Sequence, residues 1–133
     1  MLRRRLGFEP AAGVAVPYLR ERIEMTITKV TSTARVPTES ASRYLQQVCK
    51  HWAHSLAVEF TPEHGTIVFP RDARGADHPG DALVTFDADG AALSARIDAT
   101  SPAQLEGLKG AVARHVDRFA FREAPLPFDW QDD

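Results

Sequence analysis

Alternating apolar and polar positions open the regular part of the chain. The stretch TKVTSTARVP (28–37) is rich in β-branched residues, which favour strands. Pro37 ends the pattern, because proline cannot donate a hydrogen bond to a neighbouring strand. The stretch therefore predicts a strand with one face toward a core. The apolar residues on that face are Val30, Ala34 and Val36.

Apolar residues with the spacing of a helix follow the predicted strand. In TESASRYLQQVCKHWAHS (38–55), apolar residues recur every three or four positions, as in an amphipathic helix. Thr38 is a candidate N-cap, and Glu39 suits the positive end of the helix dipole. We expect a helix of about four turns that ends near Ser55. The residues expected on its buried stripe are Ala41, Tyr44, Leu45, Val48 and Trp52.

Two hairpins come next, separated by a loop. In LAVEFTPEHGTIVFP (56–70), PEHG is expected to supply the turn, with Gly65 able to take positive φ. The segment RDARGADHPGD (71–81) has no periodicity and predicts a loop. The second hairpin, ALVTFDADGAALSARIDA (82–99), turns at DADG. Its inward-facing residues are expected to include Leu93, Ala95 and Ile97.

A second helix is predicted in SPAQLEGLKGAVARHVDRFAFRE (101–123). Ser101 is its expected N-cap, Pro102 takes the first helical position, and Gln104 completes a capping box. Gly107 and Gly110 either weaken the helix or allow close packing on the sheet. Its expected buried stripe is Leu105, Leu108, Val112, Val116 and Phe119, and Phe128 and Trp130 of the extended tail are expected to fold back onto the core.

The predicted order is β-α-β-β-β-β-α, an α+β fold. Four consecutive strands between two helices favour an antiparallel sheet with both helices on one face. That order is used by TATA-binding-protein-like or helix-grip-like domains, an analogy that carries no function with it. We expect a single domain over residues 25–133. Residues 1–24, whose apolar stretch is broken by prolines, are interpreted as a flexible leader; the alternative is an arm that covers a sheet edge.

Composition narrows the classes of function. The 16 Lys and Arg stand against 18 Asp and Glu, so no positive surplus favours nucleic acid or an anionic membrane. A single cysteine excludes an internal disulfide and fits a reducing compartment. No apolar run approaches the roughly 20 residues that a membrane helix needs. We therefore expect a cytoplasmic protein without a nucleic-acid or membrane partner.

Three stretches together resemble one small bacterial family. They are RYLQQVCKHWAH (43–54), VEFTPEHGTIVFP (58–70), and HVDRFAFRE (115–123) followed by FDW (128–130). They make the chain similar to the domain-of-unknown-function family 2218 over most of its length. The resemblance implies a compact bacterial protein of unassigned activity. Relatives are often encoded beside, or fused to, siderophore-interacting ferric reductases, which implies a role near iron acquisition and such a reductase as a partner. The chain departs from the family pattern in a longer 71–81 loop and at Trp52.

The segment CKHWAHS (49–55) places the single cysteine near two histidines. Because each residue of a helix turns by about 100°, Cys49 and His51 point roughly 160° apart and cannot hold one metal ion. The same geometry excludes His51 as a base for a Cys49 nucleophile. We interpret Cys49 as a buried thiol on the flank of the apolar stripe. Cys49, Trp52 and Phe119 are therefore assigned to the structural core.

His51 and His115 are the histidines that the two helices bring toward each other. Each lies at an edge of its apolar stripe, so helices packed side by side place them across one groove, with His54 at the rim. Two histidines joined by a further ligand suit iron, zinc or haem. Asp117 points roughly 160° away from His115 and does not complete such a set. The alternative is a pair of half-buried, hydrogen-bonded histidines that lock the helices together.

The stretch RFAFRE (118–123) interleaves two arginines with two phenylalanines. Arg118 and Arg122 are candidates for an anion-binding edge, because arginine makes bidentate contacts to carboxylate and phosphate. The alternative is that Arg122 pairs with Glu123 or Asp117.

These observations support two main hypotheses of function. The first is a non-catalytic accessory or binding domain in an iron-siderophore context, with no cofactor and with His51, His54, His115 and Arg122 as candidate ligand-binding residues. The second is a small metal- or haem-dependent enzyme that uses the histidines, with His51 and His115 as candidate metal ligands. A third possibility is a structural partner that docks on a reductase or self-associates through the open face of the sheet.

Overall fold

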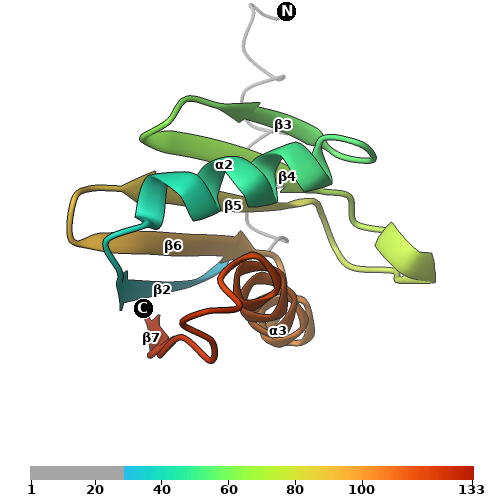
Figure 1. The fold of residues 1–133 in the computed structure, drawn as a ribbon. Helices are drawn as coiled ribbons and strands as arrows, with labels where there is room; N and C mark the ends of the chain where they lie inside the picture. The colour runs from blue at the N-terminus through green and yellow to red at the C-terminus, as the bar shows by residue number, and fades with distance from the viewer. Residues whose placement is uncertain (1–28) are drawn as a thin grey trace, which may run out of the picture.

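A computed structural model describes residues 29–133, in which two helices cover one face of a six-stranded antiparallel sheet (Figure 1). The predicted α+β class, the β-α-β-β-β-β-α order and the placement of both helices on one face are therefore confirmed. The proposed leader, residues 1–24, lies outside the described residues. None of the helices within 29–133 is long and apolar enough to cross a membrane.

The sheet is built from a four-stranded meander and two added strands. Strands β3 (Ala57–Phe60), β4 (His64–Phe69), β5 (Ala82–Ala88) and β6 (Ala92–Ala99) follow one another along the chain and pair in that order. Strand β2 (Val30–Pro37) lies beside β6, with Val30 opposite Ala99 and Pro37 opposite Ala92. A two-residue strand, β7 (Gln131–Asp132), pairs with β2 and was not predicted. The first strand of the described chain is thus internal to the sheet.

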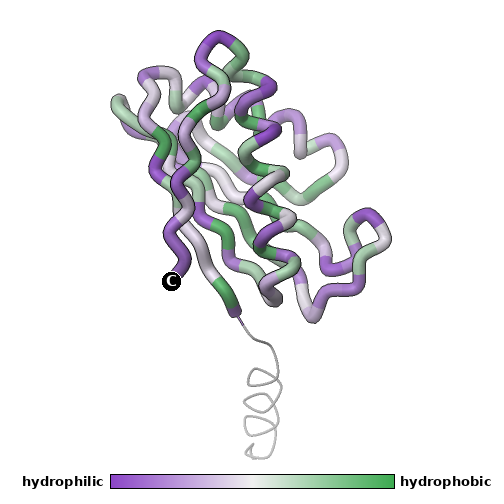
Figure 2. Tube along the Cα trace, turned by 90° about the horizontal axis from the view of Figure 1, so that it is seen from below, coloured by the Kyte–Doolittle hydropathy of each residue, from purple (hydrophilic) through white to green (hydrophobic). Residues whose placement is uncertain are grey.

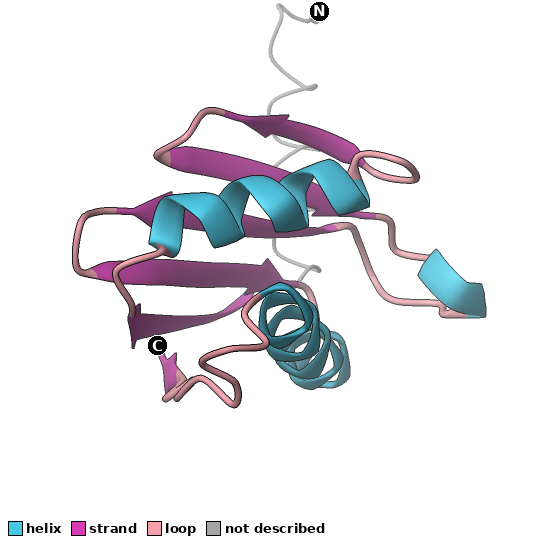
Figure 3. Cartoon of the chain, in the orientation of Figure 1, coloured by secondary structure: helices cyan, strands magenta, loops and turns pink. Residues whose placement is uncertain are grey.

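The core lies between the sheet and the helices α2 (Ala41–Trp52) and α3 (Pro102–Phe119) (Figure 3). Helix α2 packs on β3, β4, β5 and β6, whereas α3 packs on β6 and β2. Apolar and polar residues alternate along the strands, so each strand sends one set of side chains into this layer (Figure 2). The largest fully buried side chains are Phe86, Leu45, Ile67, Leu93, Ile97, Val36, Val48, Val84, Val112 and Val116.

Helix α2 begins later and ends earlier than the sequence pattern indicates. Its N-cap is Ser40, not Thr38, and the helix ends at Trp52, not near Ser55. Thr38 was misassigned because its side chain serves a tighter local turn: its Oγ1 accepts a hydrogen bond from the backbone N–H of Ser40 at 3.1 Å. The predicted buried stripe of the helix is confirmed, and Cys49 joins it.

Helix α3 begins at the predicted cap. The Ser101 hydroxyl accepts a hydrogen bond from the backbone N–H of Gln104 at 3.1 Å, and Pro102 follows the cap. The Gln104 side chain does not return to Ser101, as a full capping box requires. Its Oε1 accepts from the backbone N–H of Thr100 at 2.7 Å, and its Nε2 donates to the carbonyl of Gly80 at 3.0 Å. Gln104 therefore joins the start of α3 to the end of the 71–81 loop.

Gly65 lies in strand β4, so its predicted place in the turn is wrong, and its φ is not positive. The residue is buried where α2 crosses the strand. A Cβ atom at this position would lie 2.8 Å from Sγ of Cys49 and 3.2 Å from Cβ of Phe60. Glycine is therefore required at this position by close helix–strand packing and not by backbone conformation.

The two glycines of α3 do not serve close packing on the sheet. A Cβ atom on Gly107 would have no atom within 4 Å outside its own helix, and a Cβ atom on Gly110 would meet only the Arg114 side chain of the same helix. Of the two readings offered by the sequence, local weakening of the helix is therefore the one that the structure supports.

Replacing Gly107 by alanine is expected to raise the free energy of unfolding by about 1 kcal/mol. Alanine costs less backbone entropy in a helix interior, and its methyl group has open space at this position. Urea unfolding followed by circular dichroism measures the change. A decrease in stability would contradict the assignment of Gly107 as an unconstrained helical residue.

Candidate functional site

The two helices bring His51 and His115 together. Their ring centroids lie 5.4 Å apart with the planes inclined by 44°. Trp52 lies against His115, with centroids 4.7 Å apart, and Phe119 lies edge-on to His51 at 6.0 Å. Both histidines are half-buried in the groove between α2 and α3.

A backbone hydrogen bond sets the orientation of His115. Its Nδ1 lies 2.7 Å from the carbonyl oxygen of Ala111, one helical turn earlier. Since a carbonyl oxygen can only accept, Nδ1 carries the proton in this contact. In the neutral ring, the free lone pair is therefore on Nε2, which is the nitrogen available to a ligand or a metal ion.

His54 and Arg122, the other two residues of the predicted site, do not join this pair. His54 is exposed in the turn after α2. Arg122 lies beyond the end of α3 and lines a separate depression with Arg43, Gln47 and Phe121. The sequence placed all four residues on one helix–helix groove, but the groove has two ends, and α3 ends before Arg122.

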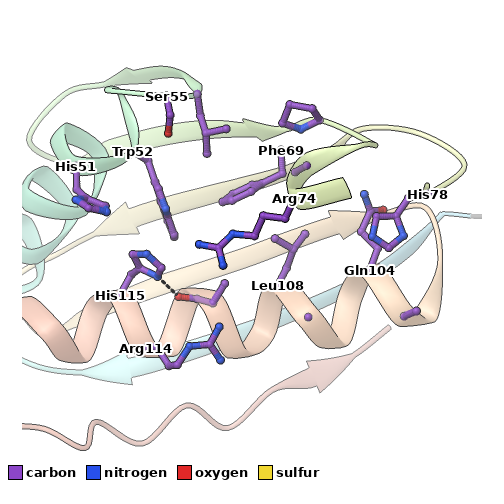
Figure 4. A pocket seen from close by; sticks show the side chains of 16 residues that line it. His51, Trp52, Ser55, Phe69, Arg74, His78, Gln104, Leu108, Arg114 and His115 are labelled. Atoms are coloured by element: carbon purple, nitrogen blue, oxygen red, sulfur yellow. Dashed lines mark hydrogen bonds between the residues drawn. The ribbon is translucent and has the colours of Figure 1, made fainter. Parts of the chain in front are cut away.

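A cavity of about 570 Å³ lies beside the histidine pair (Figure 4). Its walls come from the end of α2, the part of α3 from Ala103 to His115, the end of β4 and the following loop. Trp52 and Phe69 form one aromatic wall, with ring centroids 5.1 Å apart and planes nearly perpendicular. The other lining residues are His51, Ser55, Leu56, Pro70, Ala73, Arg74, His78, Ala103, Gln104, Gly107, Leu108, Ala111, Arg114 and His115.

The loop between β4 and β5 contributes residues that the sequence pattern did not single out. Arg74 extends from this loop into the cavity, with its guanidinium directed toward His115 (Figure 4). His78 is half-buried at the far end of the cavity. The sequence signal that pointed to this loop is its run of charged residues, glycine and proline between two strands, since loops held by a scaffold often carry binding residues.

The charged side chains of the cavity lining are two arginines, Arg74 and Arg114. The lining also contains three histidines, and it contains no aspartate or glutamate. The pKa of His51 is lowered first because the ring is partly buried. Electrostatic repulsion from His115, Arg118 and His54 also disfavours a positive charge on the ring and lowers the pKa further. At neutral pH His51 is therefore a neutral ring in a positively charged surrounding.

The lowered pKa of His51 predicts a loss of stability in mild acid. As the pH falls through about 6.5, the unfolded chain takes up a proton at this position that the folded chain does not yet bind. The free energy of unfolding should therefore fall from pH 7.5 to pH 5.5, and the decrease should be smaller in a His51→Gln variant. Urea unfolding of the parent and of the His51→Gln variant at both pH values tests this, and an equal decrease in the two proteins would contradict the prediction.

Cys49 has no part in this site. Its side chain is fully buried against Gly65 and Leu45, on the sheet side of α2. Burial raises the pKa of the thiol to about 11, so the group is protonated at neutral pH. The thiol therefore behaves as a small apolar side chain.

The histidine pair supplies at most part of a metal site. Within residues 29–133, no group of three or more His, Cys, Asp or Glu side chains is arranged to hold one metal ion. Zinc in proteins takes four ligands, three of them from protein in catalytic sites. Any metal at His51 and His115 would therefore need ligands from a bound small molecule or from water.

A carboxylate organises the opposite end of the helix pair. Glu123 accepts hydrogen bonds from the hydroxyl of Tyr44 and from Thr38 Oγ1, the latter at 3.0 Å to Oε1. Tyr44 and Thr38 are both buried. The hydrogen bond to Glu123 is the largest cause of a raised pKa of the Tyr44 phenol, followed by burial. Glu123 thus ties the segment after α3 to the beginning of α2 and does not pair with Arg122, as the sequence had suggested for that arginine.

The chain is similar to known proteins in both sequence and fold. The family model described as "Uncharacterized protein conserved in bacteria" (DUF2218) matches residues 33–131. The NMR structure of PA4090 from Pseudomonas aeruginosa is similar, with 32% sequence identity and a TM-score of 0.59, over 79% of this chain and 96% of that one. No curated protein matches. Because the family model spans most of the chain, this protein is a member of the bacterial DUF2218 family.

Proposed function

We propose that the chain is a cytoplasmic, non-catalytic binding domain, and that its ligand is a small molecule held in the cavity beside His51 and His115. The cavity itself is the observation that carries this proposal. Its volume of about 570 Å³ falls within the usual range for ligand pockets, and aromatic walls with a few convergent polar groups are typical of them.

The iron-siderophore context implied by the family resemblance suggests which ligands to test first. Many siderophores carry aromatic or carboxylate iron-binding groups, and both kinds of group suit a lining of Trp52, Phe69 and arginine. Under this proposal, the domain holds a siderophore, or a fragment of one, for a reductase.

Tryptophan fluorescence tests the binding proposal. In a Trp130→Phe variant, Trp52 in the cavity wall is the remaining tryptophan. Titration with iron-free and ferric catecholate siderophores should quench or shift its emission in a saturable manner. Gly107→Leu places a larger side chain in the cavity without adding a second tryptophan, and it should abolish the response. The absence of any saturable change across aromatic and carboxylate chelators would count against the siderophore proposal.

A second candidate function is a metal- or haem-dependent enzyme. The observation in its favour is the facing histidine pair, in which the backbone contact of His115 leaves Nε2 free. Protein purified without a histidine tag should then contain stoichiometric iron or zinc, or show a Soret band, and His51→Ala or His115→Ala should lose it. A metal-free protein that also fails to take up added iron or zinc would remove this candidate.

The proposed partner is a siderophore-interacting reductase, or a second copy of the chain, bound on the open face of the sheet. That face carries charges of both signs, including an ion pair between Arg96 and Asp98 at 3.2 Å. Such a surface favours a protein partner over nucleic acid. Co-purification with the neighbouring reductase, compared with sedimentation of the domain alone, separates the two partners.

A further inference from the structure

We infer that the ligand of the cavity is a small organic anion with a flat apolar body, and that Arg74 binds its anionic group while Trp52 and Phe69 contact the body. This inference rests on the proposed binding function and adds the chemical class of the ligand. It depends on three features of the cavity: the position of Arg74, the charge of the lining and the aromatic wall.

The loop holds Arg74 in an unusual backbone conformation. Its φ of 57° and ψ of 34° lie in the left-handed region, which residues with a Cβ atom rarely occupy. Arg74 lies in a short 3₁₀ turn, Ala73–Gly75, and from this turn its side chain extends into the cavity (Figure 4). Strained backbone of this kind persists where the surrounding structure holds it, and it is concentrated at ligand sites.

Hydrogen bonds at the base of the loop hold this conformation. The backbone N–H of Arg71 donates to Asp81 at 2.8 Å, and Nε of Arg71 donates to the carbonyl of His78 at 3.0 Å. Gln104 and Thr100 bind Gly80 from the other side. The loop is thus closed at its base by Arg71 and attached to Thr100 and to Gln104 of α3, and the strained turn lies between these contacts.

The two arginines of the loop have different electrostatic surroundings. Arg71 forms an ion pair with Asp77 on the loop itself. Arg74 points into a cavity whose lining has no carboxylate. An exposed guanidinium that lines a cavity without a carboxylate favours an anion, and it binds carboxylate, sulfonate or phosphate groups through paired hydrogen bonds.

The apolar part of the cavity lining favours a ligand with a flat apolar body. Trp52 and Phe69 meet edge to face and present ring surface to the cavity, and Leu56 and Leu108 extend the apolar lining. A flat apolar body lies well against such rings. A small inorganic anion would satisfy Arg74 but would leave this surface uncovered, so an aromatic or otherwise flat organic anion fits better.

Two related fluorescent probes test the inference on the full chain. They are 8-anilinonaphthalene-1-sulfonate, a flat anion, and N-phenyl-1-naphthylamine, which has the same rings without the sulfonate. The anionic probe should bind about tenfold or more tightly than the neutral probe, because a charge-assisted contact contributes that much. Arg74→Gln should remove this difference and leave the neutral probe unaffected. Arg35→Gln, which removes an exposed arginine on the open face of the sheet, should change neither.

The outcomes separate the inference from the binding proposal. If both probes bind equally well and Arg74→Gln has no effect, the cavity binds small molecules but the anion assignment is wrong. If neither probe binds, or if Gly107→Leu leaves binding unchanged, both proposals fail. Arg74→Asn adds a readout of the strained turn, because asparagine tolerates the left-handed region: this variant should lose the anionic probe while its melting temperature stays the same or rises.

Discussion

Replacing Gly65 by alanine is expected to destabilise the protein by about 2 kcal/mol. The added methyl group would lie 2.8 Å from Sγ of Cys49 and 3.2 Å from Cβ of Phe60. Neither neighbour has free space into which to move, because Cys49 is fully buried and Phe60 belongs to the paired strand β3. Helix α2 would therefore have to shift away from the sheet. Urea unfolding measures the cost.

A double mutant identifies the cause of this destabilisation. Cys49→Ala removes the sulfur atom that the new methyl group meets, so the Gly65→Ala substitution should cost less in that background, by about 1 kcal/mol or more. Gly90→Ala is the matched control, since a Cβ atom there meets nothing within 4 Å, and its stability should stay within about 0.5 kcal/mol of the parent. Strict additivity of the Gly65 and Cys49 substitutions would show that the contact does not limit packing.

Replacing Glu123 by alanine is expected to cost about 2 to 3 kcal/mol of stability. The substitution removes the common acceptor of two buried hydroxyl groups, those of Tyr44 and Thr38. Leaving a buried donor without a partner is more costly than losing an exposed contact. Glu123→Gln keeps one acceptor oxygen and should fall between the parent and the alanine variant. Glu106→Ala, which removes an exposed ion pair with Lys109, should cost less than about 0.5 kcal/mol.

The phenol of Tyr44 reports directly on this contact. Its pKa is raised, first by the hydrogen bond to Glu123 and then by burial. In a Tyr18→Phe background Tyr44 is the only tyrosine, so an ultraviolet titration follows this group alone. Glu123→Ala should lower the pKa of Tyr44, and burial should keep it above the ordinary value. An unchanged titration would mean that Glu123 does not accept this hydrogen bond in solution.

The two ends of the helix pair differ in their side-chain contacts. At one end, Glu123 and the hydroxyls of Tyr44 and Thr38 form a satisfied polar contact that joins the helices. At the other end, His51, His115 and Arg74 line a cavity without a carboxylate. Stability and binding can therefore be tested separately: substitutions at Glu123 should change unfolding, whereas Arg74 substitutions should change ligand affinity.

Much of the fold follows from local patterns. The period of two in the strands, the period of three to four in the helices and the Ser101 cap place nearly every element, because they reflect which side of each element faces the core. The same angular reasoning correctly separated Cys49 from His51. The resemblance of three stretches to one family was confirmed by the family match.

Tertiary contacts decided the features that local sequence patterns did not predict. The sequence could not show that Gly65 lies under Cys49, because the need for glycine arises from a helix crossing a strand and not from a turn. It brought His51 and His115 to one groove by helical spacing, but it added Arg122, because the helical spacing does not show that α3 ends at Phe119. It gave no role to Arg74, because a loop without periodicity has no defined face until hydrogen bonds between Arg71 and Asp81 and from Gln104 of α3 to Gly80 hold it. The sequence by itself therefore determined the elements and their buried faces, and the packing between elements decided which polar residues share the cavity.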